Sequence, residues 1–168
     1  MLPEKEKHYE LATRKLLKKA DSLPLDKFDR INLKNITLML RDSFKLEYVR
    51  EFVLGQEFKD TFHWAAGFCL SSSECVYRLT KGGHIWDFMH INDIWTYGPH
   101  CYLRHRQSGI IYDITADQYT CFGMQIPYNL GRANFIGELI YNESPSRLAE
   151  INNIDLIAES KRLGSYKG

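Results

Sequence analysis

The chain has 168 residues, a length that corresponds most simply to one domain. Its hydrophobic fraction of 44% and charged fraction of 26% are typical of a globular protein, and its net charge of +1 argues against binding to a nucleic-acid backbone. The chain begins MLPEKEKHYE and contains neither the apolar stretch of a signal peptide nor an apolar run of about 18 residues. We therefore expect a cytoplasmic protein without membrane association. Its four cysteines are expected to be reduced, although an even number also fits disulfides.

The first sixty residues predict helices. Residues 6–23 repeat apolar side chains near a period of 3.6 residues, and Pro24 ends this helix. Residues 36–55 predict one helix or two, with Gly55 as the stop. The apolar side chains expected to share one side of this second segment are Leu38, Leu40, Phe44, Tyr48, Val49 and Phe52.

The remainder changes character after residue 60, where short apolar runs alternate with Gly, Pro and Asn as in a strand-rich region. Residues 144–164 predict a C-terminal helix that begins at Ser144 and Pro145 and is open to a break at two asparagines. This order predicts an α+β fold with a helical N-terminal region, a helix packed on an antiparallel sheet and a C-terminal helix. We expect one domain, residues 1–168, made of a helical part (1–60), a core (61–130) and that helix (144–164).

The segments HCYLRH and IIYDIT predict a β-hairpin with RQSG as its loop. With a loop of two or four residues, alternation puts His100 and Asp113 on one face as diagonal neighbours and sends Cys101 and His105 to the other. A carboxylate hydrogen bond would fix the tautomer of the imidazole and stabilise its cation, as a general base requires. The alternatives are a surface hairpin whose polar side chains only face water, or a loop of three or five residues that reverses the parity.

Cys69 is the best candidate for the nucleophile that such a pair would activate. It follows Gly67, and CLSSSECVYRLT then predicts a helix that ends near Gly82. A thiol at a helix N-terminus has a lowered pKa, and the free backbone N–H groups there stabilise an oxyanion. We therefore predict Cys69 as nucleophile, His100 as general base and later acid, and Asp113 as the group that orients the imidazole, with no cofactor and no metal.

This order of residues, a Cys, then a His on a strand, then an Asp on the next, resembles papain-like and transglutaminase-like cysteine enzymes. YDITADQY is also similar to the D-L-T-x-x-Q-[FY] motif of small, uncharacterised bacterial YunG-like proteins. The resemblance covers about residues 63–120 and implies a hydrolase or transferase that acts on an amide of a protein or peptide substrate. The papain-type oxyanion glutamine falls on His63, and Trp64 and Gln118 are further candidates for substrate or oxyanion binding. Leu70 follows the nucleophile, where transglutaminases usually have Trp.

Two other functions compete with the enzyme. The five histidines between positions 63 and 105 and the four cysteines suggest zinc, but they lack the close ligand pairs that zinc sites usually have. Aromatic residues, 13% of the chain, are concentrated between positions 58 and 128, which also fits a non-catalytic protein-binding or inhibitory module on the same fold. The substrate, the acyl acceptor (water or an amine) and the oligomeric state stay open.

Overall fold

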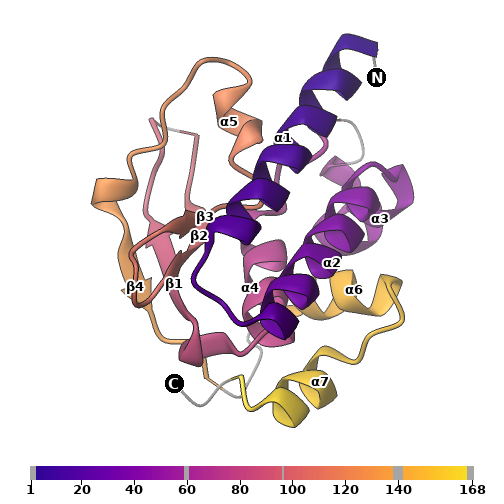
Figure 1. The fold of residues 1–168 in the computed structure, drawn as a ribbon. Coiled ribbons are helices and arrows are strands. Elements are labelled where there is room, and N and C mark those ends of the chain that lie inside the picture. The colour runs from indigo at the N-terminus through magenta and orange to yellow at the C-terminus, as the bar shows by residue number, and fades with distance from the viewer. Residues whose placement is uncertain (1–2, 59–60, 96, 138–141, 166–168) are drawn as a thin grey trace.

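The computed structural model describes residues 3–58, 61–95, 97–137 and 142–165. These residues form an α+β fold with N-terminal helices, a four-stranded antiparallel sheet and C-terminal helices (Figure 1). Helix α4 (Cys69–Leu79) lies at the centre, where it contacts the sheet on one side and helices from both ends of the chain on the other. No helix in the described part of the chain is long and apolar enough to cross a membrane.

The N-terminal region forms three helices, α1 (Pro3–Ser22), α2 (Lys27–Phe44) and α3 (Glu47–Leu54). The predicted first helix is therefore confirmed, and the second segment is two helices. Helix α2 begins nine residues before the predicted segment because the Asp26 carboxylate caps it, accepting a hydrogen bond from the Asp29 N–H at 2.8 Å. Gly55 ends α3 with φ +110°, as predicted.

The expectation of a single apolar side along residues 36–55 is only partly met. The chain changes direction between α2 and α3, so side chains on the two helices face different surroundings. Three of the six apolar side chains lie in the core, and three are exposed. The buried three are Leu40, Phe44 and Val49, and the exposed three are Leu38, Tyr48 and Phe52.

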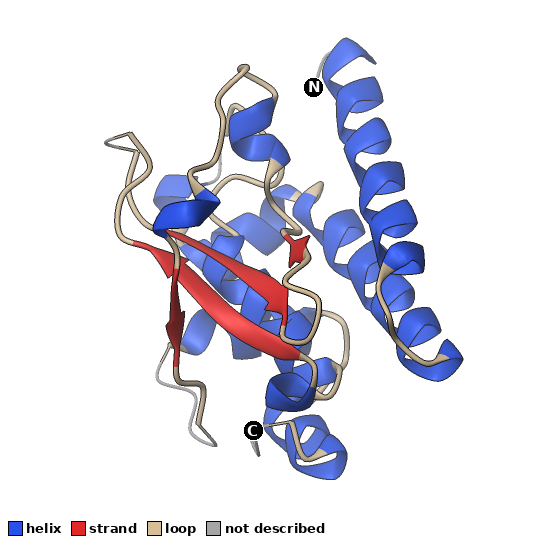
Figure 2. Ribbon diagram, turned by 60° about the vertical axis from the view of Figure 1, so that its left-hand side comes forward, coloured by secondary structure: helices blue, strands red, loops and turns tan. Residues whose placement is uncertain are grey.

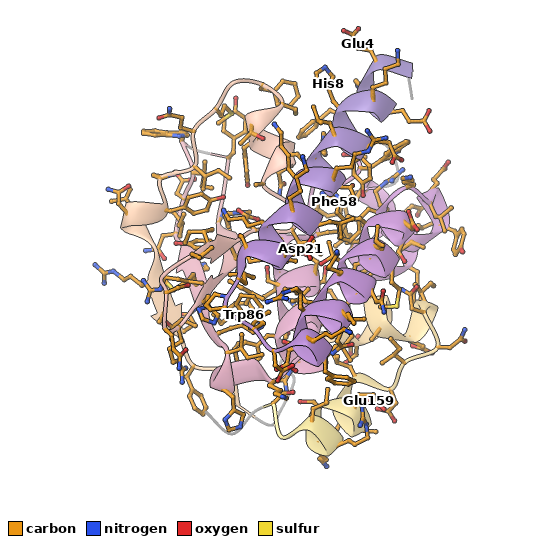
Figure 3. The ribbon with its side chains drawn as sticks, in the orientation of Figure 1. Glu4, His8, Asp21, Phe58, Trp86 and Glu159 are labelled. Carbon is orange, nitrogen blue, oxygen red and sulfur yellow. The ribbon has the colours of Figure 1, made fainter. Side chains whose placement is uncertain are left out.

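The sheet consists of β1 (Trp86–Ile91), β2 (His100–His105), β3 (Ile111–Tyr112) and β4 (Arg132–Asn134) in the order β3-β2-β1-β4 (Figure 2). Its inner face packs on α4, and the fully buried Trp86 donates from its indole N–H to the Thr80 hydroxyl at 2.9 Å. Figure 3 shows Trp86 inside the molecule, whereas the charged Glu4 and Glu159 lie at its periphery.

The hairpin formed by β2 and β3 has the predicted parity. Leu103 lies opposite Tyr112, and the His105 N–H donates to the Ile110 carbonyl at 2.8 Å, so the loop contains four residues. Gly109 in this loop has φ +74°, which favours glycine. The register therefore confirms the parity on which the pairing of a histidine with an aspartate depends.

A short helix, α5 (Asp117–Thr120), follows β3. The C-terminal region forms two helices, α6 (Glu143–Ile151) and α7 (Leu156–Leu163). The single predicted helix is thus interrupted at its asparagines, where Asn153 adopts φ +59°. The N-cap of α6 is Asn142, whose side chain accepts from the Ser144 N–H at 2.9 Å, so the helix begins earlier than predicted. Gly164 caps α7 in the left-handed conformation.

Candidate active site

Cys69 is held at the first position of α4 by the two residues that precede it. Gly67 has φ +86°, and a Cβ atom there would lie 2.9 Å from Leu54 Cδ1, so both the backbone conformation and the space favour glycine. Phe68 is completely buried and stacks on Phe44 of α2 with ring centroids 4.3 Å apart. This anchoring fixes the position of the thiol between the helical part and the sheet.

The first turn of α4 contains backbone N–H groups that have no acceptor within the helix. Phe68 is the N-cap and makes no side-chain capping bond. The Ser72 N–H is the donor that closes the first turn, to the Phe68 carbonyl at 2.9 Å. The N–H groups before Ser72, including that of Cys69, precede the ladder of helical hydrogen bonds and point toward the helix N-terminus. They are therefore suited to bind an anion or a developing oxyanion next to the thiol.

His100 and Asp113 are brought together as predicted. His100 Nε2 and Asp113 Oδ2 lie 2.6 Å apart, and the His100 side chain is fully buried. The other carboxylate oxygen of Asp113 accepts from the Thr115 N–H at 3.2 Å. Because Nε2 is occupied by Asp113, Nδ1 is the ring nitrogen left for chemistry, and it is buried without a hydrogen-bond partner among the described residues.

The thiol and the imidazole shift each other's pKa in opposite directions. The neighbouring Cys101 and His100 side chains together hold the pKa of Cys69 well below its usual range, although burial opposes this. Burial alone would lower the pKa of His100, but the charge of Asp113, a hydrogen bond to it and the nearby Cys69 raise it to about 10. Both shifts favour a thiolate that faces an imidazolium.

Cys101 reaches this thiol from the opposite face of β2. As predicted, it alternates away from His100, and it lies in the core between the sheet and α4. The start of α4 crosses β2 at this point, because Ser73 donates its hydroxyl to the Cys101 carbonyl at 3.2 Å and Cys69 Sγ lies 4.0 Å from the Pro99 carbonyl oxygen. Both faces of β2 therefore contribute a side chain to the surroundings of Cys69.

His63 and Trp64 lie in the segment before α4, where their side chains have other partners. His63 Nδ1 accepts from the Ala65 N–H at 3.1 Å, and Nε2 lies 3.2 Å from Asp117 Oδ2. The Trp64 ring packs edge-on against Tyr9 of α1, with centroids 5.0 Å apart. Both ring nitrogens of His63 are thus engaged in holding this segment in place.

Gln118, the third residue considered for substrate or oxyanion binding, lies in α5 on the wall of a hollow that Cys69 also lines. It is 6% exposed, and its Nε2 is buried without a hydrogen-bond partner among the described residues. Together with Cys69 it lines one of the hollows described below. An unpaired buried donor is costly, and an acceptor atom on a bound ligand would remove this cost. Gln118 is therefore a candidate donor to an oxyanion at Cys69.

A buried ion pair holds α5, and with it Gln118, in position. Arg41 of α2 makes two hydrogen bonds of 2.8 Å to the carboxylate of Asp117 and a third of 2.8 Å to the Ile114 carbonyl. Burial would raise the pKa of Asp117, but Arg41 and His63 lower it to about 2. The same carboxylate therefore ties α2, α5 and the segment before α4 together.

Two hollows meet at Cys69. The loop-side hollow, about 600 Å³, lies between the segment before α4, α5 and the loop before β2, and the sheet-side hollow, about 490 Å³, lies between the start of α4 and strands β1 and β4. Cys69 and Pro99 line both hollows. None of the described residues lining either hollow is Asp, Glu, Lys or Arg, whereas 26% of the chain is charged. The linings of the two hollows therefore lack carboxylate, ammonium and guanidinium groups and are rich in aromatic rings.

Two residues of the site escaped prediction from the sequence. Strand alternation puts Cys101 on the opposite face of the hairpin from His100. It does not reveal that the start of α4 brings Cys69 near both side chains. Tyr128 donates its hydroxyl to Asp113 Oδ2 at 2.7 Å, from a 3-10 turn, Tyr128–Leu130, in a loop without periodicity. In the sequence, the Pro and Gly of this loop, QIPYNLGR (residues 125–132), indicate only a turn.

No family model matches the chain, and neither a curated protein nor a solved structure matches it significantly. In the described part of the chain, no group of three or more His, Cys, Asp or Glu side chains is arranged to hold a metal ion. The chemistry of the site is therefore inferred from its own residues, foremost Cys69, His100 and Asp113.

Proposed function

We propose that the protein is a cysteine-dependent enzyme that transfers an acyl group from an amide, similar to papain-like and transglutaminase-like enzymes. Cys69 is the nucleophile, His100 the general base and acid, and Asp113 the group that orients the imidazole. The observation that carries the proposal is the 2.6 Å contact of His100 with Asp113 next to a thiol whose pKa is strongly lowered. A thiol with a lowered pKa near an imidazole with a raised pKa is a common feature of catalytic sites.

Acylation begins with the thiolate of Cys69 attacking the carbonyl carbon of the amide. The electron pair of the C=O bond moves to oxygen, and an S–C bond forms. When the tetrahedral intermediate collapses, the C–N bond breaks, and the leaving amine takes the proton of His100 Nδ1. The products of this half-reaction are a thioester on Cys69, a free amine and a neutral imidazole still bonded to Asp113.

Deacylation reverses the roles of the same groups. Neutral His100 takes a proton from the acceptor at Nδ1, and the acceptor attacks the thioester carbonyl. The S–C bond then breaks, and the thiolate–imidazolium pair is restored. Water as acceptor makes the protein a peptidase, amidase or deamidase, and an amine makes it a transamidase.

The oxyanion of both tetrahedral intermediates needs donors aimed at the carbonyl oxygen. We assign this role to the backbone N–H groups at the start of α4 and to Gln118 Nε2, because that donor is buried and unpaired and belongs to a residue that lines a hollow together with Cys69. His63 is less suited, since its two nitrogens already have partners.

A protein or peptide is the substrate class that fits the surroundings of Cys69 best. Hollows on both sides of the thiol offer space for groups on both sides of a scissile amide. A small amide with a single substituent would fill only one of them. The uncharged linings favour apolar groups, because burying an unpaired charge is costly.

A mass-spectrometric screen with a peptide mixture tests the proposed reaction. The wild-type protein is incubated with the mixture, with and without a primary amine, beside the variants Cys69→Ala and Cys121→Ala. We expect cleaved, deamidated or amine-linked peptides with the wild type and with Cys121→Ala, and none with Cys69→Ala. Products that persist at the wild-type rate in Cys69→Ala would refute the nucleophile, and their kind in the wild type identifies the acceptor.

A non-catalytic binding module is the second candidate, favoured by one observation. Phe62, Tyr97 and Phe135 line the two hollows and are 54%, 70% and 91% exposed, an amount of open aromatic surface typical of recognition sites. A binding module predicts that Cys69→Ala keeps full affinity for a partner and that the wild type produces no modified peptide.

A further inference from the structure

Tyr128 shares with His100 the carboxylate oxygen that orients the imidazole. Its hydroxyl donates to Asp113 Oδ2 at 2.7 Å, and the same oxygen lies 2.6 Å from His100 Nε2. Thr115 N–H occupies the other oxygen at 3.2 Å. The carboxylate is thus held by three donors, two of which compete for the negative charge of a single oxygen.

The 3-10 turn that carries Tyr128 is fixed against the sheet. The Tyr102 hydroxyl donates to the Tyr128 carbonyl at 3.1 Å, and the two rings meet edge to face with centroids 4.8 Å apart. A Cβ atom on Gly131 would lie 1.9 Å from the Tyr102 hydroxyl, so a glycine permits this close approach. The turn is also held by its own backbone hydrogen bonds, so ring packing and these bonds remain to place the Tyr128 hydroxyl when the Tyr102 hydroxyl is removed.

Tyr128 stays a hydrogen-bond donor over the whole ordinary pH range. Burial, and then the negative charge of Asp113, raise its pKa above the usual value of a phenol. Two side chains of the described residues bond the Asp113 carboxylate directly, that of His100 and that of Tyr128. The other titratable groups around the pair are Cys69, Cys101, Tyr102 and Tyr119, with Lys15, Lys19 and Asp117 across a hollow on the side of α1.

We propose that Tyr128 is a positioning residue of the site: it fixes the Asp113 carboxylate and withdraws part of its negative charge from the imidazole of His100. This inference rests on the proposed function. A donor on Oδ2 makes that oxygen a weaker acceptor for the imidazolium N–H, so it limits how tightly the proton is held on His100. The imidazolium must release the proton on Nδ1 to the leaving group. A weaker hold on the protons of His100 therefore favours this proton transfer.

Tyr128→Phe and Tyr102→Phe form a matched pair of variants. The first removes the donor to Asp113, whereas the second removes a bond to the loop backbone and leaves that donor in place. Nitrogen-15 NMR of the histidine side chains gives the pKa of His100 without any substrate. We expect Tyr128→Phe to raise the pKa of His100 and Tyr102→Phe to leave it within ~0.2 units of the wild type. Where activity is found, kcat should fall about tenfold in Tyr128→Phe with KM unchanged, the size of one hydrogen bond to a charged group.

The NMR and the kinetic results separate the two proposals. An unchanged pKa of His100 in folded Tyr128→Phe, or an equal rise in Tyr102→Phe, would overturn the role of Tyr128 whether or not the protein is an enzyme. A raised pKa together with no reaction in the wild type would support the role of Tyr128 in the site and count against the proposed function. Thermal unfolding of both variants verifies that each is folded.

Discussion

His100 Nε2 lies 2.6 Å from Asp113 Oδ2, although the two residues are not cross-strand partners. The register that sets Leu103 opposite Tyr112 leaves Asp113 just beyond β3 and diagonal to the first residue of β2. A diagonal contact of this kind requires the hairpin loop to have an even number of residues. The pairing is therefore a direct consequence of the four-residue loop.

The charge of Asp113 is expected to set the alkaline limit of activity. The thiolate of Cys69 is lost as pH falls through its lowered pKa, and the imidazolium of His100 is lost as pH rises through its raised pKa of about 10. We therefore predict a broad plateau of kcat/KM across neutral pH that ends near pH 10. In Asp113→Asn the alkaline limb should move toward the ordinary histidine pKa of about 6.5, because the carboxylate charge is the strongest influence that raises the pKa of His100. An alkaline limb that stays in place in this variant would show that His100 is not the group that titrates.

The Cys101 thiol is expected to stabilise the thiolate of Cys69. The Cys101 side chain has the largest of the influences that lower the pKa of Cys69. Cys101→Ala should therefore raise the apparent pKa for alkylation of Cys69, while Cys101→Ser, which keeps an O–H donor, should change it less. The pH dependence of iodoacetamide labelling measures both values. Equal values in the two variants would mean that the donor at position 101 is unimportant.

Gln118→Ala is expected to lower kcat by about 10²–10³, the effect of losing one oxyanion donor. Alkylation of Cys69 by iodoacetamide involves no oxyanion, so its rate and pH dependence should stay as in the wild type. Gln107→Ala, in the exposed tip of the hairpin, is the matched control and should have normal kcat. A Gln118→Ala variant with normal kcat would remove Gln118 from the oxyanion site.

Arg41→Met is expected to destabilise the fold by about 3–5 kcal/mol, because it leaves the buried carboxylate of Asp117 without its main partner. Urea unfolding of the wild type and the variant gives this difference. Arg14→Met, on the exposed side of α1, should stay within about 0.5 kcal/mol of the wild type. A loss below about 1 kcal/mol in Arg41→Met would show that the buried pair is not what holds α5 in place.

The sequence was sufficient for the features that depend on local patterns. Periodicity and glycine positions predicted α1, the start of α4 at Cys69 and the end of α3 at Gly55, and strand alternation predicted the face shared by His100 and Asp113. These features need only neighbouring residues and standard backbone geometry.

Contacts between distant segments could not be predicted in the same way. The Arg41–Asp117 pair joins residues that are 76 positions apart, and nothing in the residues around either one indicates the other. The approach of Tyr128 to Asp113 depends on how an irregular loop returns to the sheet. Likewise, Cys101 comes near Cys69 because the start of α4 lies over β2, which is a matter of tertiary packing.

Differential alkylation of the native cysteines tests the central claim most directly. Cys69 is only partly exposed and Cys121 is exposed, so accessibility alone predicts faster labelling of Cys121. Partial burial of its thiol still raises the pKa of Cys121, whereas the surroundings of Cys69 lower the pKa of Cys69. With limiting iodoacetamide at neutral pH and peptide mass spectrometry, we predict that Cys69 is labelled first, with an apparent pKa well below the value of about 8.5 for a free thiol. Labelling of Cys69 after Cys121, or only after unfolding, would contradict an activated nucleophile at this site.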